Sequence, residues 1–248
     1  MKPLTSFFRA LHRLRSLGKN ESGISLVEFA FSMPFLLLMI SGGAELANYS
    51  ITKMRVSALA LQVADNASRI GEGNLLQSKK ITEAQMNDLL QGALAQSGSL
   101  NINGFSNERQ ADNSTISNAK ARIIISSLEP DPDTTNHPNK NWIRWQRCYG
   151  QATTYAPQYG TAGQDDLAGM GPTGSTVFAP DGTAIIFVEV HYRYEPLFPV
   201  VRPEMFGIMD YRDINTVAAM VVRDDRDLAG SGGTGFYNTE GVTPSVCT

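Results

Sequence analysis

The chain has 248 residues, of which 42% are hydrophobic and 18% are charged, a balance typical of a protein that folds around a buried core. Its formal net charge of −3 argues against nucleic acid as a partner, because phosphate backbones are bound by clusters of Lys and Arg. Five basic residues and one acid precede Gly23, which leaves 16 basic and 23 acidic residues in the remainder. Composition therefore predicts an acidic head on a basic tether.

An apolar segment follows this basic N-terminus. It has no charged residue between Phe29 and Ala44, and the longer stretch 24–46 would form a helix of about 34 Å, enough to cross the hydrocarbon layer of a membrane. Such a span would hold Glu28 near one membrane face and Glu45 near the other. Because the basic residues precede it, the positive-inside tendency leaves the N-terminus in the cytoplasm and sends the head across. A conventional secretory signal cleaved near Ala44 is the alternative.

The start of the apolar segment carries a recognisable motif. Residues 23–29 read GISLVEF, so that a glycine, four further residues, a carboxylate and an aromatic ring precede the apolar run. This order resembles the cleavage motif of type IV prepilins. The longer stretch GISLVEFAFSMPFLLLMISGGAELANY is similar to the N-terminus of the TadE-like pseudopilins of tight adherence (Tad) pilus systems. Their V-E-F-A core, internal proline and second glutamate correspond here to residues 27–30, Pro34 and Glu45.

The resemblance implies how this segment is processed and what it does. A prepilin peptidase, which is a membrane aspartyl protease, would cut between Gly23 and Ile24 on the cytoplasmic side and remove the leader 1–23. Glu28, Phe29 and Glu45 would take part in assembly, with Glu28 pairing with the new N-terminal amine of a neighbouring subunit. The alternative is that Glu28 only marks the membrane interface.

The resemblance also implies partners and a location. The partners would be the prepilin peptidase, other pilin or pseudopilin subunits, Tad inner-membrane assembly proteins and membrane lipid. The protein would cross the bacterial inner membrane once, with a cytoplasmic N-terminus and a periplasmic head, and incorporation into an extracellular pilus is a further option. Pro34 is expected to kink the span, because it removes a helix hydrogen bond.

Beyond the membrane the helix is expected to continue over residues 47–71. Apolar residues recur there at spacings of three and four, which predicts one stripe that packs on the head. The residues of this stripe are Val56, Leu59, Val63, Ala67 and Ile70. Gly71 and Gly73 are expected to end the helix.

The head, residues 72–248, is predicted to be α+β. Thr82 and Gln85 form a capping box at the start of a short surface helix that ends near Gly98. Segments rich in β-branched and aromatic residues are expected to form an antiparallel sheet; they are 121–128, 141–149, 184–194 and 215–223. In the third, one face runs from Ile186 to Tyr194 and is expected to meet the N-terminal helix, while Glu189, His191 and Arg193 lie on the other. The stretches 98–118, 129–140 and 151–181 are expected to be loops.

The two cysteines, Cys148 and Cys247, are predicted to form a disulfide, because the membrane argument places the head in an oxidising compartment. Two reduced thiols are the alternative.

Catalytic chemistry is not expected. The sequence contains no G-x-S-x-G, H-E-x-x-H or P-loop motif, and we predict neither an enzyme nor a cofactor. Asp131, Asp133 and Asn136 resemble the start of a calcium loop, but the later glycine and glutamate are missing, so a plain turn without metal is favoured. The expected function is that of a minor pilin or pseudopilin in a Tad-type pilus. A membrane-tethered periplasmic binding protein or adhesin that stays outside any filament is the alternative.

Overall fold

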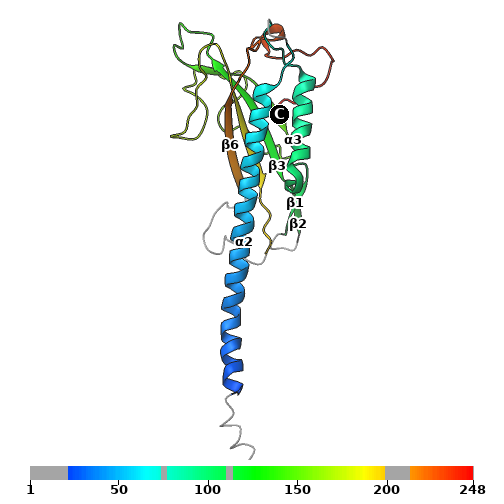
Figure 1. The fold of residues 1–248 in the computed structure, drawn as a ribbon, viewed down its shortest axis with the longest axis vertical. Coiled ribbons are helices and arrows are strands. Elements are labelled where there is room, and N and C mark those ends of the chain that lie inside the picture. Colours follow the sequence, from blue (N-terminus) through cyan, green and yellow to red (C-terminus); the bar gives the residue numbers. More distant parts are fainter. Residues whose placement is uncertain (1–21, 74–76, 110–113, 199–212, 248) are drawn as a thin grey trace, which may run out of the picture. The chain divides into compact units, whose positions relative to one another are not determined.

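The structure is a computed structural model that describes residues 22–73, 77–109, 114–198 and 213–247 (Figure 1). The predicted leader therefore lies outside the described residues, apart from its last two positions. The chain divides into two units, Met1–Asn48 and Tyr49–Thr248, which are described separately. The described elements in chain order are α2 (Ser22–Arg69), α3 (Glu83–Ser97), the 3-10 turn η1 (Gly98–Leu100), β1 (Phe105–Arg109), β2 (Thr115–Ala119), β3 (Ala121–Pro130), β4 (Asn141–Tyr149), β5 (Ile185–Arg193), β6 (Asp213–Val221) and the 3-10 turn η3 (Ser231–Gly233).

Four strands form the central antiparallel sheet of the second unit, in the order β4-β3-β5-β6. The register places Val188 of β5 between Ile125 of β3 and Ala218 of β6. The four segments predicted as strands are confirmed, and β4 has the predicted bounds. The α+β class is confirmed with them.

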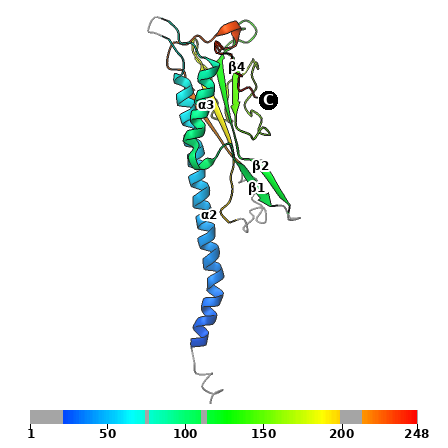
Figure 2. The ribbon, with the colours of Figure 1, turned by 90° about the vertical axis from the view of Figure 1, so that its right-hand side faces the viewer.

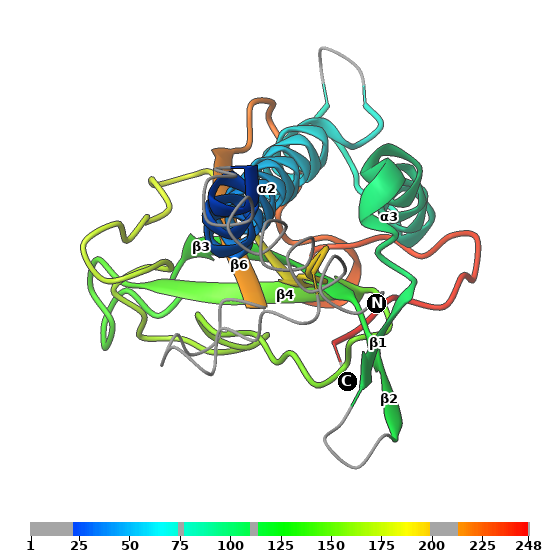
Figure 3. The ribbon, with the colours of Figure 1, turned by 90° about the horizontal axis from the view of Figure 1, so that it is seen from below.

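One face of this sheet packs against two helices. Figure 3 shows the head portion of α2 and α3 on the same side of the strands. The predicted stripe is confirmed, because Val56, Leu59, Val63 and Ala67 are buried in one core together with the β5 residues Val188 and Val190. The capping box is also confirmed, since the Thr82 hydroxyl accepts from the backbone N–H of Gln85 (3.2 Å) and the Gln85 side chain accepts from that of Thr82 (3.1 Å).

The other face of the sheet is covered by the long connection between β4 and β5. A second core forms there from Leu128, Ile143, Met170 and Phe187, with Tyr159 from the connection packed against it. Gly169 and Gly171 adopt φ values of +145° and +131°, which let this connection turn back over the strands. Both faces of the sheet are therefore buried.

The segment 98–118 was expected to be a loop, and that expectation is wrong. It contains a two-stranded hairpin in which Phe105 of β1 pairs with Ala119 of β2 (Figure 2). The hairpin leads directly into β3, because Lys120 alone separates the end of β2 from Ala121, the first residue of β3. The Lys120 N–H donates to the carbonyl of Gly104, the residue before β1 (2.9 Å). Its strands carry mainly polar residues, so apolar alternation gave no signal.

The C-terminal tail is tied to the head at two places. Cys148 and Cys247 form the predicted disulfide, with sulfur atoms 2.02 Å apart. Beside it, the Cys148 N–H donates to the Ser245 carbonyl (2.7 Å), and the Ser245 hydroxyl donates to Asn87 of α3 (2.9 Å). The tail thereby links the sheet edge β4 to α3.

Candidate membrane and assembly segment

The first unit consists, in its described part, of the N-terminal half of α2. Every residue from Gly23 to Ile40 is exposed, and large apolar side chains such as Phe31 and Met39 are 73 and 79% exposed. α2 is long and apolar enough to cross a membrane. An apolar surface of this extent is costly in water, so it requires lipid or other helices around it.

Two hydroxyl groups inside this segment are satisfied by the helix itself. The Ser32 hydroxyl donates to the Phe29 carbonyl (3.2 Å), and the Ser41 hydroxyl donates to the Leu38 carbonyl (3.2 Å). Pro34 lies within α2, as predicted, and has no N–H to donate toward the preceding turn. The kink expected at Pro34 stays a prediction. These features suit a helix in a medium without water.

Glu28 is the exception in the apolar half of α2. It is exposed, and within the described part of the chain no ion pair or side-chain hydrogen bond joins it to another residue. A carboxylate held in lipid costs about 2.5 kcal/mol or more, so an unpaired Glu28 requires a compensating cation from outside the described chain or a position at the interface. Its neighbour Phe29 is 62% exposed and equally available.

The remaining predicted site residues behave differently. Glu45 is partly buried and has an interaction partner, so it does not share the isolation of Glu28. At Gly23, a Cβ would meet no atom within 4 Å, so the glycine is not required by packing in this helix. The need for glycine at the predicted cleavage point therefore rests on the resemblance to prepilins alone.

In the head, buried charged residues form pairs that stabilise the fold. Glu83 at the start of α3 pairs with Arg147 of β4, and Glu129 of β3 pairs with Arg144 of β4 (2.6 Å). Burial raises the pKa of Glu129, although its contacts with Arg144 act in the opposite direction. Each of these carboxylates has a cation beside it, which is the usual condition for burying charge.

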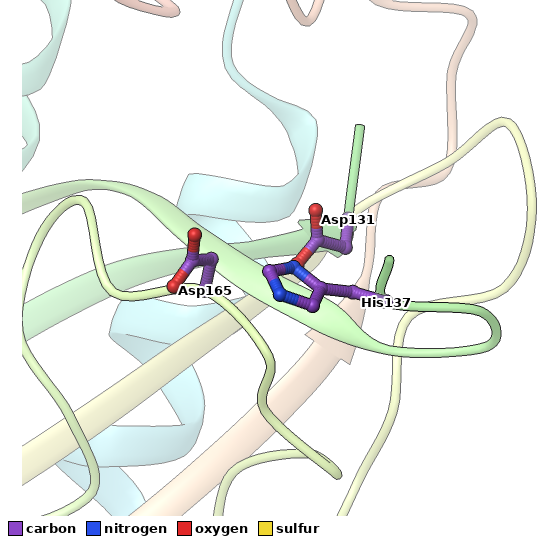
Figure 4. Close-up of side chains that lie close together, drawn as sticks. All are labelled: Asp131, His137 and Asp165. Carbon is purple, nitrogen blue, oxygen red and sulfur yellow. The ribbon is translucent and has the colours of Figure 1, made fainter. Parts of the chain in front are cut away.

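The acidic turn after β3 brings three potential metal ligands together. Atoms of Asp131, His137 and Asp165 lie within 4.8 Å of one another, and Figure 4 shows Asp165 approaching from a separate loop. The Asp131 carboxylate is already occupied by hydrogen bonds from the N–H groups of Asp133 (2.9 Å) and Asp166 (3.0 Å), and it lies 3.0 Å from the His137 ring. The turn was predicted, whereas the approach of Asp165 was not, because Asp165 lies beyond β4 in the long β4–β5 connection.

The burial of two further polar residues was not predicted from the sequence. Glu189 and His191 of β5 were placed on the polar face of the strand, but they are 0 and 3% exposed because the β4–β5 connection covers them. Glu189 accepts a hydrogen bond from the Gln158 N–H (2.9 Å), and His191 stacks on Tyr155. They fasten the connection to the sheet.

Fold and segment together define an α+β protein with one N-terminal apolar helix, which is consistent with single-pass anchoring in a membrane. Residues 23–65 match the model of a family described as TadE-like protein. The match begins at Gly23, the residue at which the motif starts, and confirms the resemblance for the N-terminal segment. It points to a component associated with the Tad pilus. Neither curated proteins nor solved structures gave a match to the chain.

Proposed function

We propose that the protein is a minor pilin or pseudopilin-like component of a Tad-type pilus, with a structural or assembly role and no catalytic one. A prepilin peptidase removes residues 1–23, and the helix beginning at Ile24 stays in the inner membrane with the head in the periplasm. The observation that carries the proposal is the TadE-like match, which starts at Gly23 and covers the exposed apolar half of α2.

Two further observations support the proposal. Glu28 lies in an apolar surface without a partner among the described residues, and the new amine at Ile24 of a neighbouring subunit would supply the missing positive charge. The disulfide between Cys148 and Cys247 suits a head in an oxidising compartment. The partners of the protein would be other pilin subunits and Tad inner-membrane proteins.

Leader removal tests the proposal directly. The intact mass of the protein purified from its native membrane should correspond to a chain that begins at Ile24. Gly23→Leu should block the cut, because the peptidase must accommodate the residue before the scissile bond, while insertion of the apolar segment continues. A chain that keeps Met1 would indicate a tethered binding protein, and one that starts near Ala44 would indicate a conventional secretory signal. Either result contradicts the proposal.

A further inference from the structure

The head portion of α2 carries an apolar stripe that the head does not use. Ile51, Met54 and Leu61 are 43, 63 and 50% exposed, and Ala58 between them is exposed as well. Their spacings of three, four and three residues are those of the a and d positions in a heptad repeat. We call these four residues the outer seam. An exposed apolar line of this kind on a folded domain indicates a contact with another molecule.

The outer seam lies on the side of α2 opposite the core. At about 100° of rotation per residue, its centre is about 170° away from the centre of the buried stripe. That stripe contains Val56, Leu59, Ala60, Val63, Ala64 and Ala67. A second helix can therefore lie along the outer seam without displacing α3 or the sheet from α2.

The residues beside the outer seam permit two identical helices to pair in parallel. Positions g are Ser50 and Ser57, and positions e are Arg55 and Gln62. In a parallel pair, each g residue faces the e residue of the following heptad in the partner helix, so serine meets Arg55 or Gln62 and no like charges oppose each other. The outer seam ends at the next a position, which is the charged residue Asp65; Asp65 is paired with Arg69 (2.9 Å).

The same heptad phase continues upstream in the sequence, through the apolar segment. All of its a and d positions are apolar there: Leu26, Ala30, Met33, Leu37, Ile40, Ala44 and Ala47. The apolar segment is therefore compatible with the phase of the outer seam, but most of its positions are apolar, so the heptad pattern itself rests on the residues from Ile51 to Leu61. Alanine at several of these positions allows close approach of two helix backbones.

We propose that α2 pairs in parallel with α2 of a second copy of this chain, along the outer seam. Two copies anchored in one membrane have parallel helices at the same depth, so each a or d residue meets its own counterpart. The three turns from Ile51 to Leu61 are too short to pair by themselves in water, but anchoring confines the copies and raises their effective concentration. The pair goes beyond the proposed pilus role, because it requires only the anchored helix.

Single-cysteine crosslinking tests the proposal. Both native cysteines are in the disulfide, so Met54→Cys introduces the one free thiol. Lys53→Cys is the matched control, because it is the next residue, is exposed and points about 100° away from Met54 around the helix. Full-length chains with two different tags are co-expressed, and their membranes are mildly oxidised. Met54→Cys should give at least about tenfold more disulfide-linked dimer containing both tags than Lys53→Cys.

Three results would overturn the proposal. Equal dimer yields from the two variants would mean random collision, and absence of the dimer would mean that the seam is not a self-contact. Crosslinking of Met54→Cys to a different protein in place of its own copy would assign the seam to that protein.

Three added substitutions make the test independent of folding and of processing. Ala58→Glu in the Met54→Cys chain should abolish the dimer, because it places like charges in the seam, whereas Lys53→Glu should leave it intact. Gly23→Leu should leave crosslinking unchanged although the leader stays. Loss of the dimer in that background would contradict the pair, whereas failed cleavage of the wild type would contradict only the pilin role.

Discussion

Arg226 completes the end of α2 from a distant part of the chain. Its Nη2 donates to the carbonyl oxygens of Ala67 (3.1 Å) and Ile70 (2.8 Å), which lie where the helix has no further N–H groups to offer. Burial lowers the pKa of the guanidinium to about 10, while Asp224 and Glu129 act to raise it. Arg226 is therefore still protonated at neutral pH and remains a charged donor.

Replacing this donor should destabilise the head. Arg226→Met keeps much of the side-chain volume but leaves two carbonyl groups without a donor, so unfolding free energy should fall by about 1–3 kcal/mol. Denaturant unfolding followed by tryptophan fluorescence measures the change. Arg223→Met is the control, because Arg223 makes a half-exposed contact with Asp65 (3.3 Å), and its loss should cost less than about 1 kcal/mol. Equal losses would mean that capping by Arg226 contributes nothing specific.

Asp131 makes the head sensitive to acid. Burial opposes ionisation of this carboxyl, but hydrogen bonds from Asp166, Asp133 and His137 outweigh burial and hold its pKa below the ordinary value. The unfolded chain binds a proton at Asp131 more readily than the folded one. The stabilisation from Asp131 is therefore complete above the unfolded pKa of about 3.9 and is lost as pH falls through the lower folded value.

The difference between wild type and Asp131→Asn isolates this contribution. The variant cannot titrate at this position, and it should be less stable than wild type at pH 7. Between about pH 5 and pH 2 the wild type should lose more stability than the variant, so the unfolding free energies of the two proteins should converge as the pH falls. Other acidic groups, including Glu129, contribute to both profiles and cancel in the comparison. A constant difference across this range would show that Asp131 does not titrate as proposed.

Among the larger elements, the C-terminal tail depends on its covalent link. Cys148 and Cys247 are separated by 99 positions, and a loop of that size gives a chain-entropy stabilisation of about 4 to 5 kcal/mol. Replacing both cysteines with serine should lower unfolding free energy by up to that amount. In natively exported protein, thiol reagents without reductant should modify neither cysteine. Labelling of both residues in the folded protein would show that the bridge is not formed.

The elements that were predicted well from the sequence have either a regular apolar spacing, set by the face of the helix or strand that is buried, or a local capping motif. The head portion of α2, the α3 cap at Thr82 and the strands β3 to β6 all follow from spacing and residue type. The β1–β2 hairpin was missed because segments such as FSNER have no apolar alternation, and its register depends on pairing.

The burial of Glu189 was missed for a different reason. A strand pattern shows which residues share a face, but the cover over that face comes from the β4–β5 connection, which has no periodicity of its own. The predicted site is likewise only partly readable in the sequence. Glu28 and Pro34 stand out in an apolar run, whereas the outer seam emerges only when the structure shows which apolar residues of α2 the head leaves exposed.

At the scale of the whole molecule, the chain combines a helix that requires an apolar environment with a head that has its own buried core on both sheet faces. Within the described residues no ion pair or side-chain hydrogen bond joins Glu28 to another residue, and we propose that its carboxylate pairs with another subunit. We therefore propose that insertion and assembly depend on different residues of the same helix. Insertion depends on the apolar length, and assembly is proposed to depend on the charge.

Glu28→Ala separates these two processes. Removing a carboxylate from an apolar helix should leave membrane insertion intact or favour it, because the cost of burying the charge disappears. Cleavage after Gly23 should also proceed. Association with partner pilins should weaken, since the neighbouring amine loses its counter-ion, and crosslinking of processed protein in native membranes at equal abundance measures this. Glu45→Ala is a useful comparison, because Glu45 already has a partner within the chain. If Glu28→Ala is cleaved, inserted and crosslinked to pilus components as efficiently as wild type, Glu28 only marks the membrane interface and the proposed assembly contact is wrong.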